Sequence, residues 1–296
     1  MHDDDVVVSD AIARALIDQQ FPEYAGLTLE RLRGPGTVNV IFRLGVDLSA
    51  RFPRRAGDRN ATRTALQSET ERCAEFADRS PFPAPRPVGV GEPGHGYPMA
   101  WSIQTWVNGT ATSPTSVAGS PGFARELATL VVALRATPTG GRRFAAGGRG
   151  GDLRDHDDWV ETCLLNSRHL FDVRVLGELW SRLRMAPRQQ ADMMTHGDLT
   201  PANLLAADGR LVGVLDSGGF GPADPALDLV AAWHLFDADA REVFRGELAC
   251  DDVEWARGKA WAFEQAVGAV WYYEASNPAM HEMGMTTLRR LLASKG

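Results

Sequence analysis

Three polar side chains stand close together in the stretch Met194–Leu229. The segment "HGDLTPANLL" places Asp198 and Asn203 five residues apart, and Pro201 stiffens the loop between them. Asp216 follows an apolar run a few residues later. Such a loop can hold one carboxylate toward a hydroxyl group, while an amide and a second carboxylate offer oxygen atoms to a hard cation. Magnesium prefers oxygen ligands and keeps waters and phosphates in its shell. Phosphoryl transfer from a nucleotide uses this set of groups.

Two short strands are expected to bring the amide and the second carboxylate together. The runs "NLLAAD" and "RLVGVLD" are joined by Asp208-Gly209, a pair typical of a tight hairpin turn. Asn203 enters the first strand and Asp216 follows the second. Because the strands of a hairpin pair side by side, the two side chains should lie close in space.

The same stretch closely resembles the aminoglycoside phosphotransferase-like kinases, a branch of the protein-kinase-like fold. Their loop motif is H-G-D-x-x-x-x-N, and their metal motif is D-x-G-x-x-G-x-x-D-P-A-x-D-L. "HGDLTPANLL" and "DSGGFGPADPALDL" match both motifs at each of those positions, and "YYEASNPAM" near the C-terminus is also similar to the family. The resemblance implies a small-molecule kinase that phosphorylates a hydroxyl group, with antibiotic resistance as the family-level expectation.

The resemblance also implies roles for individual residues of the motifs. Asp198 becomes the catalytic base, and Asn203 and Asp216 become the ligands of Mg²⁺. His196 is expected to support the loop through hydrogen bonds, because the neighbouring Asp198 already has the role of base. Asp224 and Asp228 are expected to be structural, the first as an N-cap before a helix that begins with Pro225.

The N-terminal part should bind ATP or GTP. The turn "GPGTVN" contains Gly36 and Thr37, where kinases cover the phosphates with backbone amides, although an ordinary hairpin turn explains it equally well. Arg51 in "LSARF" stands where a kinase has its phosphate-binding lysine, and Glu69 is its expected partner, with Glu71 and Glu75 as alternatives. The segment 101–107 would form the hinge, and Trp106 would line the nucleotide pocket.

The expected acceptor is a small, cationic molecule. Acidic side chains before or on two helices could bind it, or could simply be helix N-terminal acids favoured by the helix dipole: Asp155, Asp157, Asp158, Glu161 and Glu274. Other functions remain open. The chain could be a metabolite kinase acting on a sugar or an amino alcohol, a nucleotide-binding homologue without catalysis, or a magnesium-dependent hydrolase.

Composition limits the other classes of partner. The formal net charge is -7 and the pI about 5.5, which disfavours nucleic acid and anionic membrane surfaces. The acidic start "MHDDDVVVSD" is unlike a secretory signal, and no run approaches the roughly 20 apolar residues of a membrane span. The three cysteines have no paired spacing. We therefore expect a cytoplasmic monomer or homodimer with reduced thiols.

The pattern of apolar residues predicts an α+β, protein-kinase-like fold of two lobes. Residues 1–107 should form an N-lobe with an antiparallel sheet and helices, because short alternating runs are separated by turn signals there. Residues 108–296 should form a mainly helical C-lobe that holds the catalytic loop, the metal site and the acceptor-binding helices, with only the two strands of the hairpin. The Gly- and Arg-rich segment 137–155 is expected to be a mobile surface loop.

Overall fold

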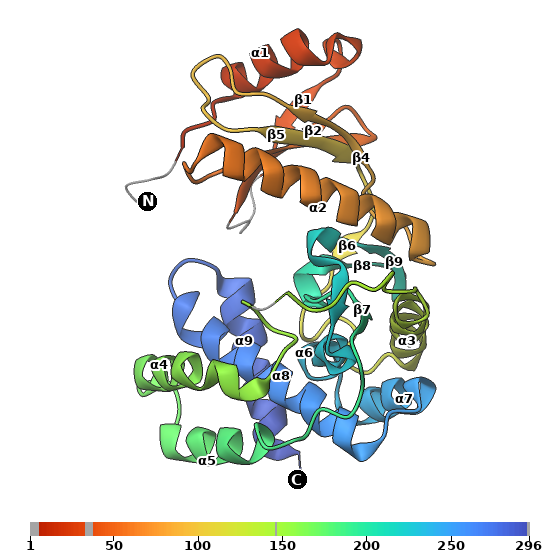
Figure 1. Cartoon of the computed structure of the whole chain (residues 1–296), viewed down its shortest axis with the longest axis vertical. Coiled ribbons are helices and arrows are strands. Elements are labelled where there is room, and N and C mark those ends of the chain that lie inside the picture. The colour runs from red at the N-terminus through yellow and green to blue at the C-terminus, as the bar shows by residue number, and fades with distance from the viewer. Residues whose placement is uncertain (1–5, 33–37, 146, 295–296) are drawn as a thin grey trace. The chain divides into compact units, whose positions relative to one another are not determined.

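The chain folds into two compact units. The computed structural model describes residues 6–32, 38–145 and 147–294. The first unit comprises residues 1–78 and 84–108, and the second comprises residues 79–83 and 109–296. Figure 1 traces the chain through its helices and strands. The short insertion 79–83 belongs with the second unit, where the Pro83 carbonyl accepts a hydrogen bond of 2.9 Å from the Val214 amide.

The first unit is built on a five-stranded antiparallel sheet, as the alternating apolar runs predict. Its strands, in spatial order, are β1 (Leu29–Arg31), β2 (Asn39–Leu44), β3 (Leu48–Pro53), β5 (Trp101–Thr105) and β4 (Pro87–Gly91). Strand β5 pairs with both β3 and β4. The segment 101–107, expected to be a hinge, is therefore mostly an interior strand whose backbone groups are used in the sheet.

Two helices pack on this sheet. Helix α1 (Asp10–Gln20) begins at the cap Ser9, whose hydroxyl accepts a hydrogen bond from the Ile12 amide, and it ends before the 3₁₀ turn η1 (Pro22–Tyr24). Its buried Leu16 and Ile17 share one apolar core with alternate residues of β2 and β3. Helix α2 (Arg59–Arg79) lies across the other face of the sheet in Figure 1. Alternation along β3 therefore points Arg51 away from the α1 core and toward α2.

The second unit is mainly helical. Its α-helices are α3 (Pro121–Arg135), α4 (Asp157–Ser167), α5 (Val173–Leu183), α6 (Ala231–Leu235), α7 (Ala238–Leu248), α8 (Asp252–Tyr272) and α9 (Pro278–Ala293). Its 3₁₀ turns are η2 (Leu153–His156), η3 (Pro201–Asn203), η4 (Ser217–Gly219) and η5 (Pro225–Val230). Residues 260–270 of α8 are buried all round, so this helix forms the centre of the unit.

Two small sheets flank the loop that carries Asp198 and the loop that begins at Asp216. The expected hairpin is confirmed as β8 (Leu204–Ala207) and β9 (Arg210–Val214), and β6 (Thr110–Ala111) joins its edge. The expectation that only these two strands interrupt the helices is wrong. Strands β7 (Met193–Thr195) and β10 (Gly221–Ala223) form a second antiparallel pair. Each is three residues long, too short for alternation to reveal it in the sequence.

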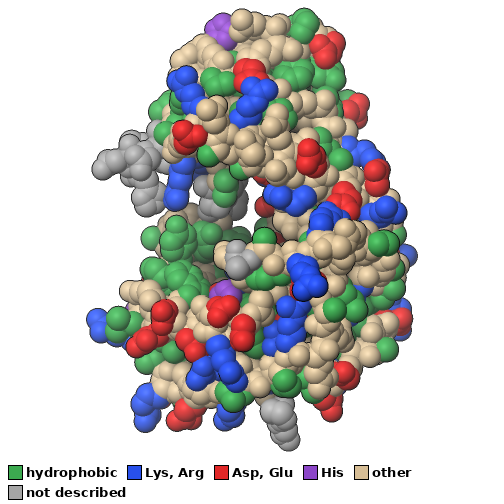
Figure 2. Space-filling model, in the orientation of Figure 1, with side chains coloured by type: hydrophobic (Ala, Val, Ile, Leu, Met, Phe, Trp, Pro, Cys, Tyr) green, Lys and Arg blue, Asp and Glu red, His purple; other side chains and the backbone are tan. Residues whose placement is uncertain are grey.

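Charged side chains of both signs are mixed on the surface. Figure 2 shows basic and acidic side chains interspersed over the face that it draws. Within the described ranges, no helix combines the length and the apolar character that a bilayer-crossing segment needs.

Candidate active site

The loop that carries Asp198 leaves strand β7 and turns sharply at Gly197. The backbone of Gly197 has a φ of 83°, a left-handed conformation that favours glycine over other residues. The metal-motif loop packs directly on it, because a Cβ added to Gly219 would lie 3.3 Å from the His196 carbonyl oxygen. The two motifs of the sequence are thus in contact through their backbones.

Asp228 holds the start of this loop through two hydrogen bonds to its backbone. Its Oδ2 accepts a hydrogen bond from the His196 amide and its Oδ1 accepts one from the Gly197 amide, both at 2.9 Å. The side chain is fully enclosed, and this burial raises the pKa of the Asp228 carboxyl. The expected structural role is therefore specific, because Asp228 holds two successive amides of the loop that carries Asp198.

His196 ties the same loop to the hairpin. Its imidazole is buried, and Nε2 lies 2.9 Å from the Leu215 carbonyl oxygen, which can only accept. This contact assigns the proton to Nε2, so Nδ1 is the acceptor for the Asp198 amide at 3.3 Å. Both ring nitrogens are engaged with the backbone, which is the geometry of a supporting residue.

Asn203 and Asp216 are brought together at the base of the hairpin. The Leu215 amide donates to the Asn203 carbonyl at 2.7 Å, which sets Asp216 beside Asn203. The Asn203 amide nitrogen donates to the Asp198 carbonyl at 2.9 Å and to Asp198 Oδ2 at 3.0 Å. The amide oxygen of Asn203 therefore faces away from the Asp198 carboxylate. Asp216 is exposed and has a left-handed backbone (φ 58°), which aspartate tolerates better than most residues.

Helix α8 supplies a further contact to the same carboxylate. Gln265 Nε2 donates a hydrogen bond of 2.7 Å to Asp198 Oδ1, and Arg149 Nη2 lies 3.5 Å from the same oxygen. The Asp198 side chain keeps 39% of its surface exposed, so a substrate hydroxyl could still reach it. Arg149 belongs to the segment 137–155 that was expected to be a mobile loop, so this contact links that segment to Asp198.

A buried carboxylate, Glu264, lies next to Gln265. Its Oε1 is 2.9 Å from His156 Nδ1, and its Oε2 is 3.8 Å from Arg149 Nη1. The hydrogen bond to Glu264 raises the pKa of His156, against the opposing effect of burial. Arg149 therefore bridges the buried carboxylate of Glu264 and the partly exposed carboxylate of Asp198.

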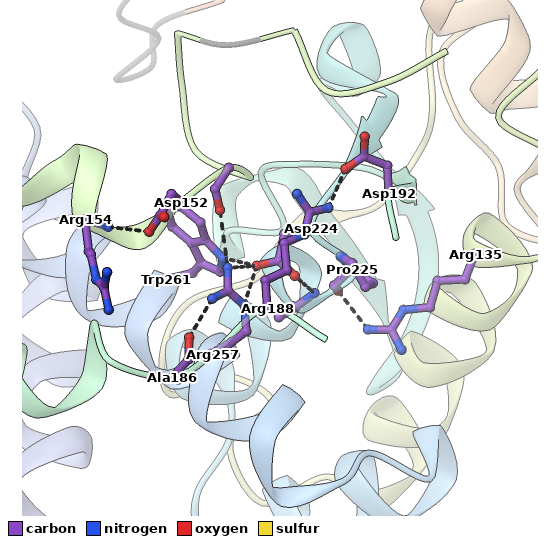
Figure 3. Close-up of polar contacts among 12 residues, drawn as sticks. Arg135, Asp152, Arg154, Ala186, Arg188, Asp192, Asp224, Pro225, Arg257 and Trp261 are labelled. Carbon is purple, nitrogen blue, oxygen red and sulfur yellow. Dashed lines mark hydrogen bonds and ion pairs between the residues drawn. The ribbon is translucent and has the colours of Figure 1, made fainter. Parts of the chain in front are cut away.

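Asp224 anchors the end of the metal motif to α8. Figure 3 shows the Arg257 guanidinium and the Trp261 indole converging on Asp224, which accepts from Arg257 Nη2 at 2.5 Å and from Trp261 Nε1 at 2.9 Å. Its Oδ1 also accepts from the Ala226 amide, which confirms the expected N-cap. Arg257 and Asp224 are both almost fully buried, so the pair locks the motif to the centre of the second unit.

The described residues that are expected to bind the nucleotide lie within the first unit. Arg51 Nη1 is 3.8 Å from Glu69 Oε1 and 3.5 Å from Gln104 Oε1, so the structure forms the ion pair that the sequence suggested. The half-buried Trp106 packs against the Arg43 guanidinium, whose carbon lies 4.7 Å from the ring centroid. Gly36 and Thr37 lie outside the described residues.

The candidate acceptor-binding acids fall into two groups. Asp157 accepts from Trp180 Nε1 at 2.8 Å and from Arg184 Nη1 at 2.5 Å, and Glu274 Oε2 lies 2.9 Å from His169 Nε2. These two carboxylates are engaged with other side chains of the second unit. The remaining three acids are exposed on η2 and the first turns of α4: Asp155, Asp158 and Glu161.

Two features of the site escaped sequence reasoning. Glu264 and Gln265 are polar neighbours inside "WAFEQAVGAV", an apolar stretch of α8, and that contrast was a usable signal. Arg149 stands among the glycines of "GGRGG", where nothing local indicates a contact with Asp198.

Among the residues that the structure describes, no group of three or more His, Cys, Asp or Glu side chains could hold a metal ion. The candidate metal ligands are instead one amide and one carboxylate.

Comparison with protein families and sequences gives one long and one short match. The model of the family described as "APH: Phosphotransferase enzyme family" matches residues 31–261. An aminoglycoside 3'-phosphotransferase of Escherichia coli is 34% identical over 61 residues, which is 20% of this chain and 22% of that protein. The matched segment thus spans about a fifth of that relative.

Solved structures share the fold over nearly the whole chain. The GDP complex of wild-type aminoglycoside 2'-phosphotransferase-IIIa superposes with a TM-score of 0.70 at 17% identity, covering 97% of this chain and 99% of that one. The macrolide 2'-phosphotransferase MphH of Brachybacterium faecium gives a TM-score of 0.58 at 19% identity, covering 95% and 98%. At such identities the likeness establishes the fold.

Proposed function

Because the chain belongs to the phosphotransferase enzyme family, we propose that it transfers the γ-phosphoryl group of ATP or GTP to a hydroxyl group of a small molecule. The first acceptor class to consider is an antibiotic such as an aminoglycoside. The observation that carries this proposal is the arrangement around Asp198, whose carboxylate is partly exposed and oriented by Asn203 and Gln265. Asp216 stands beside Asn203 at the base of the same hairpin.

Asp198 acts as the base in this proposal. It accepts the proton of the acceptor hydroxyl as that oxygen attacks the γ-phosphorus, and the bond to the nucleoside diphosphate breaks. His196 and Asp228 hold the loop, because their contacts go to its backbone rather than toward solvent. The base is thus preorganised before a substrate binds.

Asn203 and Asp216 would hold Mg²⁺. The fit rests on their donor chemistry, since an amide oxygen and a carboxylate are hard ligands of the kind that magnesium accepts alongside waters and phosphates. Asn203 already directs its nitrogen to Asp198, which leaves its oxygen on the other side of the amide. The bound ion would neutralise charge on the nucleotide phosphates.

The first unit would hold the nucleotide, and the second unit would carry the base, the metal ligands and the acceptor. Arg51, paired with Glu69, is the candidate phosphate ligand. Trp106 would contact the purine ring of the nucleotide. The exposed acids of η2 and α4, Asp155, Asp158 and Glu161, favour a cationic acceptor.

The test is an acceptor panel with MgATP and with MgGTP, with phosphorylated product detected by mass. The panel contains aminoglycosides, macrolides, sugars and amino alcohols, and a reaction without acceptor measures hydrolysis. The matched control is Asp198→Asn, which keeps the size of the side chain and should lower turnover by about a hundredfold or more. Nucleotide hydrolysis that no acceptor converts into product, or full turnover by Asp198→Asn, would overturn the proposal.

A further inference from the structure

Three side chains that are distant in sequence form a buried hydrogen-bonded line ending at Asp198. Gln265 of α8 donates to Asp198 Oδ1 at 2.7 Å. Gln265 Oε1 lies 3.0 Å from His234 Nε2 of α6, and His234 Nδ1 lies 2.9 Å from Thr287 Oγ1 of α9. His234 and Thr287 are completely buried and Gln265 is nearly so. The line joins the core of the second unit to the partly exposed carboxylate of Asp198.

The chemistry of the groups fixes the direction of each hydrogen bond. An ionised carboxylate only accepts, so Gln265 must turn its nitrogen to Asp198 and its oxygen to His234. His234 Nε2 must then carry a proton. Burial lowers the pKa of His234 to about 4, so the ring is neutral and Nδ1 accepts from the Thr287 hydroxyl. Thr287 also approaches the Trp233 carbonyl at 3.4 Å, but its hydroxyl has a single proton to donate and the contact with His234 Nδ1 is the shorter one.

All three donors therefore point toward Asp198. Hydrogen bonds aligned in one direction polarise one another, so the last donor is strengthened by those behind it. Asn203 holds Asp198 Oδ2 while Gln265 holds Oδ1, and the plane of the carboxylate is fixed from both sides. A base that accepts a proton from a bound hydroxyl needs this fixed geometry.

We propose that Gln265 is a positioning residue for the Asp198 carboxylate, and that His234 and Thr287 set the orientation of its amide. In this proposal Gln265 acts through its hydrogen bond to Asp198. The inference rests on the proposed function for its kinetic consequence, whereas the direction of the hydrogen bonds can be measured without turnover. A wrong tautomer at His234 would reverse the Gln265 amide and turn its oxygen onto the carboxylate.

The kinetic test compares Gln265→Leu, Gln265→Glu, Thr287→Val and Thr287→Ser with an acceptor that the wild-type protein phosphorylates, kanamycin being tried first. Gln265→Leu should lower kcat by roughly tenfold to a hundredfold and leave the KM for MgATP within about twofold. Gln265→Glu should lose at least as much, because its charge opposes Asp198 at the same distance. Thr287→Val should lower kcat a few-fold, and Thr287→Ser should restore it.

The matched control is Thr137→Val, since the buried Thr137 hydroxyl donates to the Ala133 carbonyl of the preceding helix α3. It should leave kcat unchanged. An unchanged kcat in Gln265→Leu, or a raised KM with normal kcat, overturns the positioning role while the proposed function stands. Failure of the wild-type protein with each acceptor counts against the proposed function instead.

The spectroscopic test applies whether or not the wild-type protein phosphorylates one of the acceptors. In ¹⁵N-histidine NMR of the full chain, with His234 assigned through His234→Gln, the ring should carry its proton on Nε2 and not on Nδ1. Gln265→Leu should shift the Nε2 resonance. A proton on Nδ1 reverses the line of donors and overturns the proposal.

Discussion

Acidification should destabilise this protein through one buried imidazole, that of His234. The ring is completely buried, and this burial lowers its pKa from 6.5 to about 4, with Arg149 and Arg290 also disfavouring the cation and the Gln265 hydrogen bond favouring it. Between these two pH values the unfolded chain binds a proton at His234 that the folded protein does not bind. The stabilising contribution is therefore complete above about pH 6.5 and is lost as the pH falls toward 4.

The magnitude follows from the size of the shift. One pKa unit corresponds to about 1.4 kcal/mol, so His234 alone should lower the free energy of unfolding by about 2 kcal/mol between pH 7.5 and pH 5. His156 acts in the opposite direction, because its hydrogen bond to Glu264 raises its pKa. That opposing effect is common to the wild-type protein and to a variant at position 234, so the difference between them isolates His234.

The assay is urea unfolding at pH 7.5 and pH 5, followed by tryptophan fluorescence, for the wild-type protein and His234→Gln. The variant should lose about 2 kcal/mol less than the wild-type protein over this range, whatever its stability at pH 7.5. The matched control is His169→Gln, because the His169 imidazole is half-exposed and paired with Glu274 at the surface. An equal pH dependence of the wild-type protein and His234→Gln would refute the assignment, as would an NMR titration that protonates His234 near pH 6.5.

Substitutions at three further positions test the two units separately. Asp228→Asn should lower the free energy of unfolding by about 2 kcal/mol and reduce turnover, since an amide nitrogen would face one of the two loop N–H groups that Asp228 accepts; thermal melting and product formation measure the two effects. Asp216→Ala should raise the Mg²⁺ concentration needed for half-maximal transfer, and an unchanged magnesium titration would place the ligand elsewhere. Arg51→Ala should weaken ATP binding in calorimetry while Arg51→Lys retains much of it, and the exposed control Arg55→Ala should change little; equal affinities for these variants would remove Arg51 from the nucleotide site.

Features that depend on neighbours in the chain could be predicted from the sequence. The hairpin at Asp208-Gly209 and the cap at Asp224 before Pro225 both form as expected. These features depend on turn chemistry and on short-range hydrogen bonds, which a few adjacent residues determine. The loop with Asp198 and Asn203 is equally local, because five residues separate the two side chains. For the same reason its residues could be proposed as site residues without a structure.

The partners of these side chains were decided by tertiary packing. Gln265 reaches Asp198 across 67 residues, and Arg149 reaches it across 49, from a glycine-rich segment that has no periodicity. Asp157 looked available for an acceptor, yet α5 brings Arg184 onto it. Local sequence shows that a side chain is polar, but which group it meets depends on how helices far apart in the chain pack. Burial makes these contacts necessary for stability, because a buried polar group must form its hydrogen bonds with partners inside the fold.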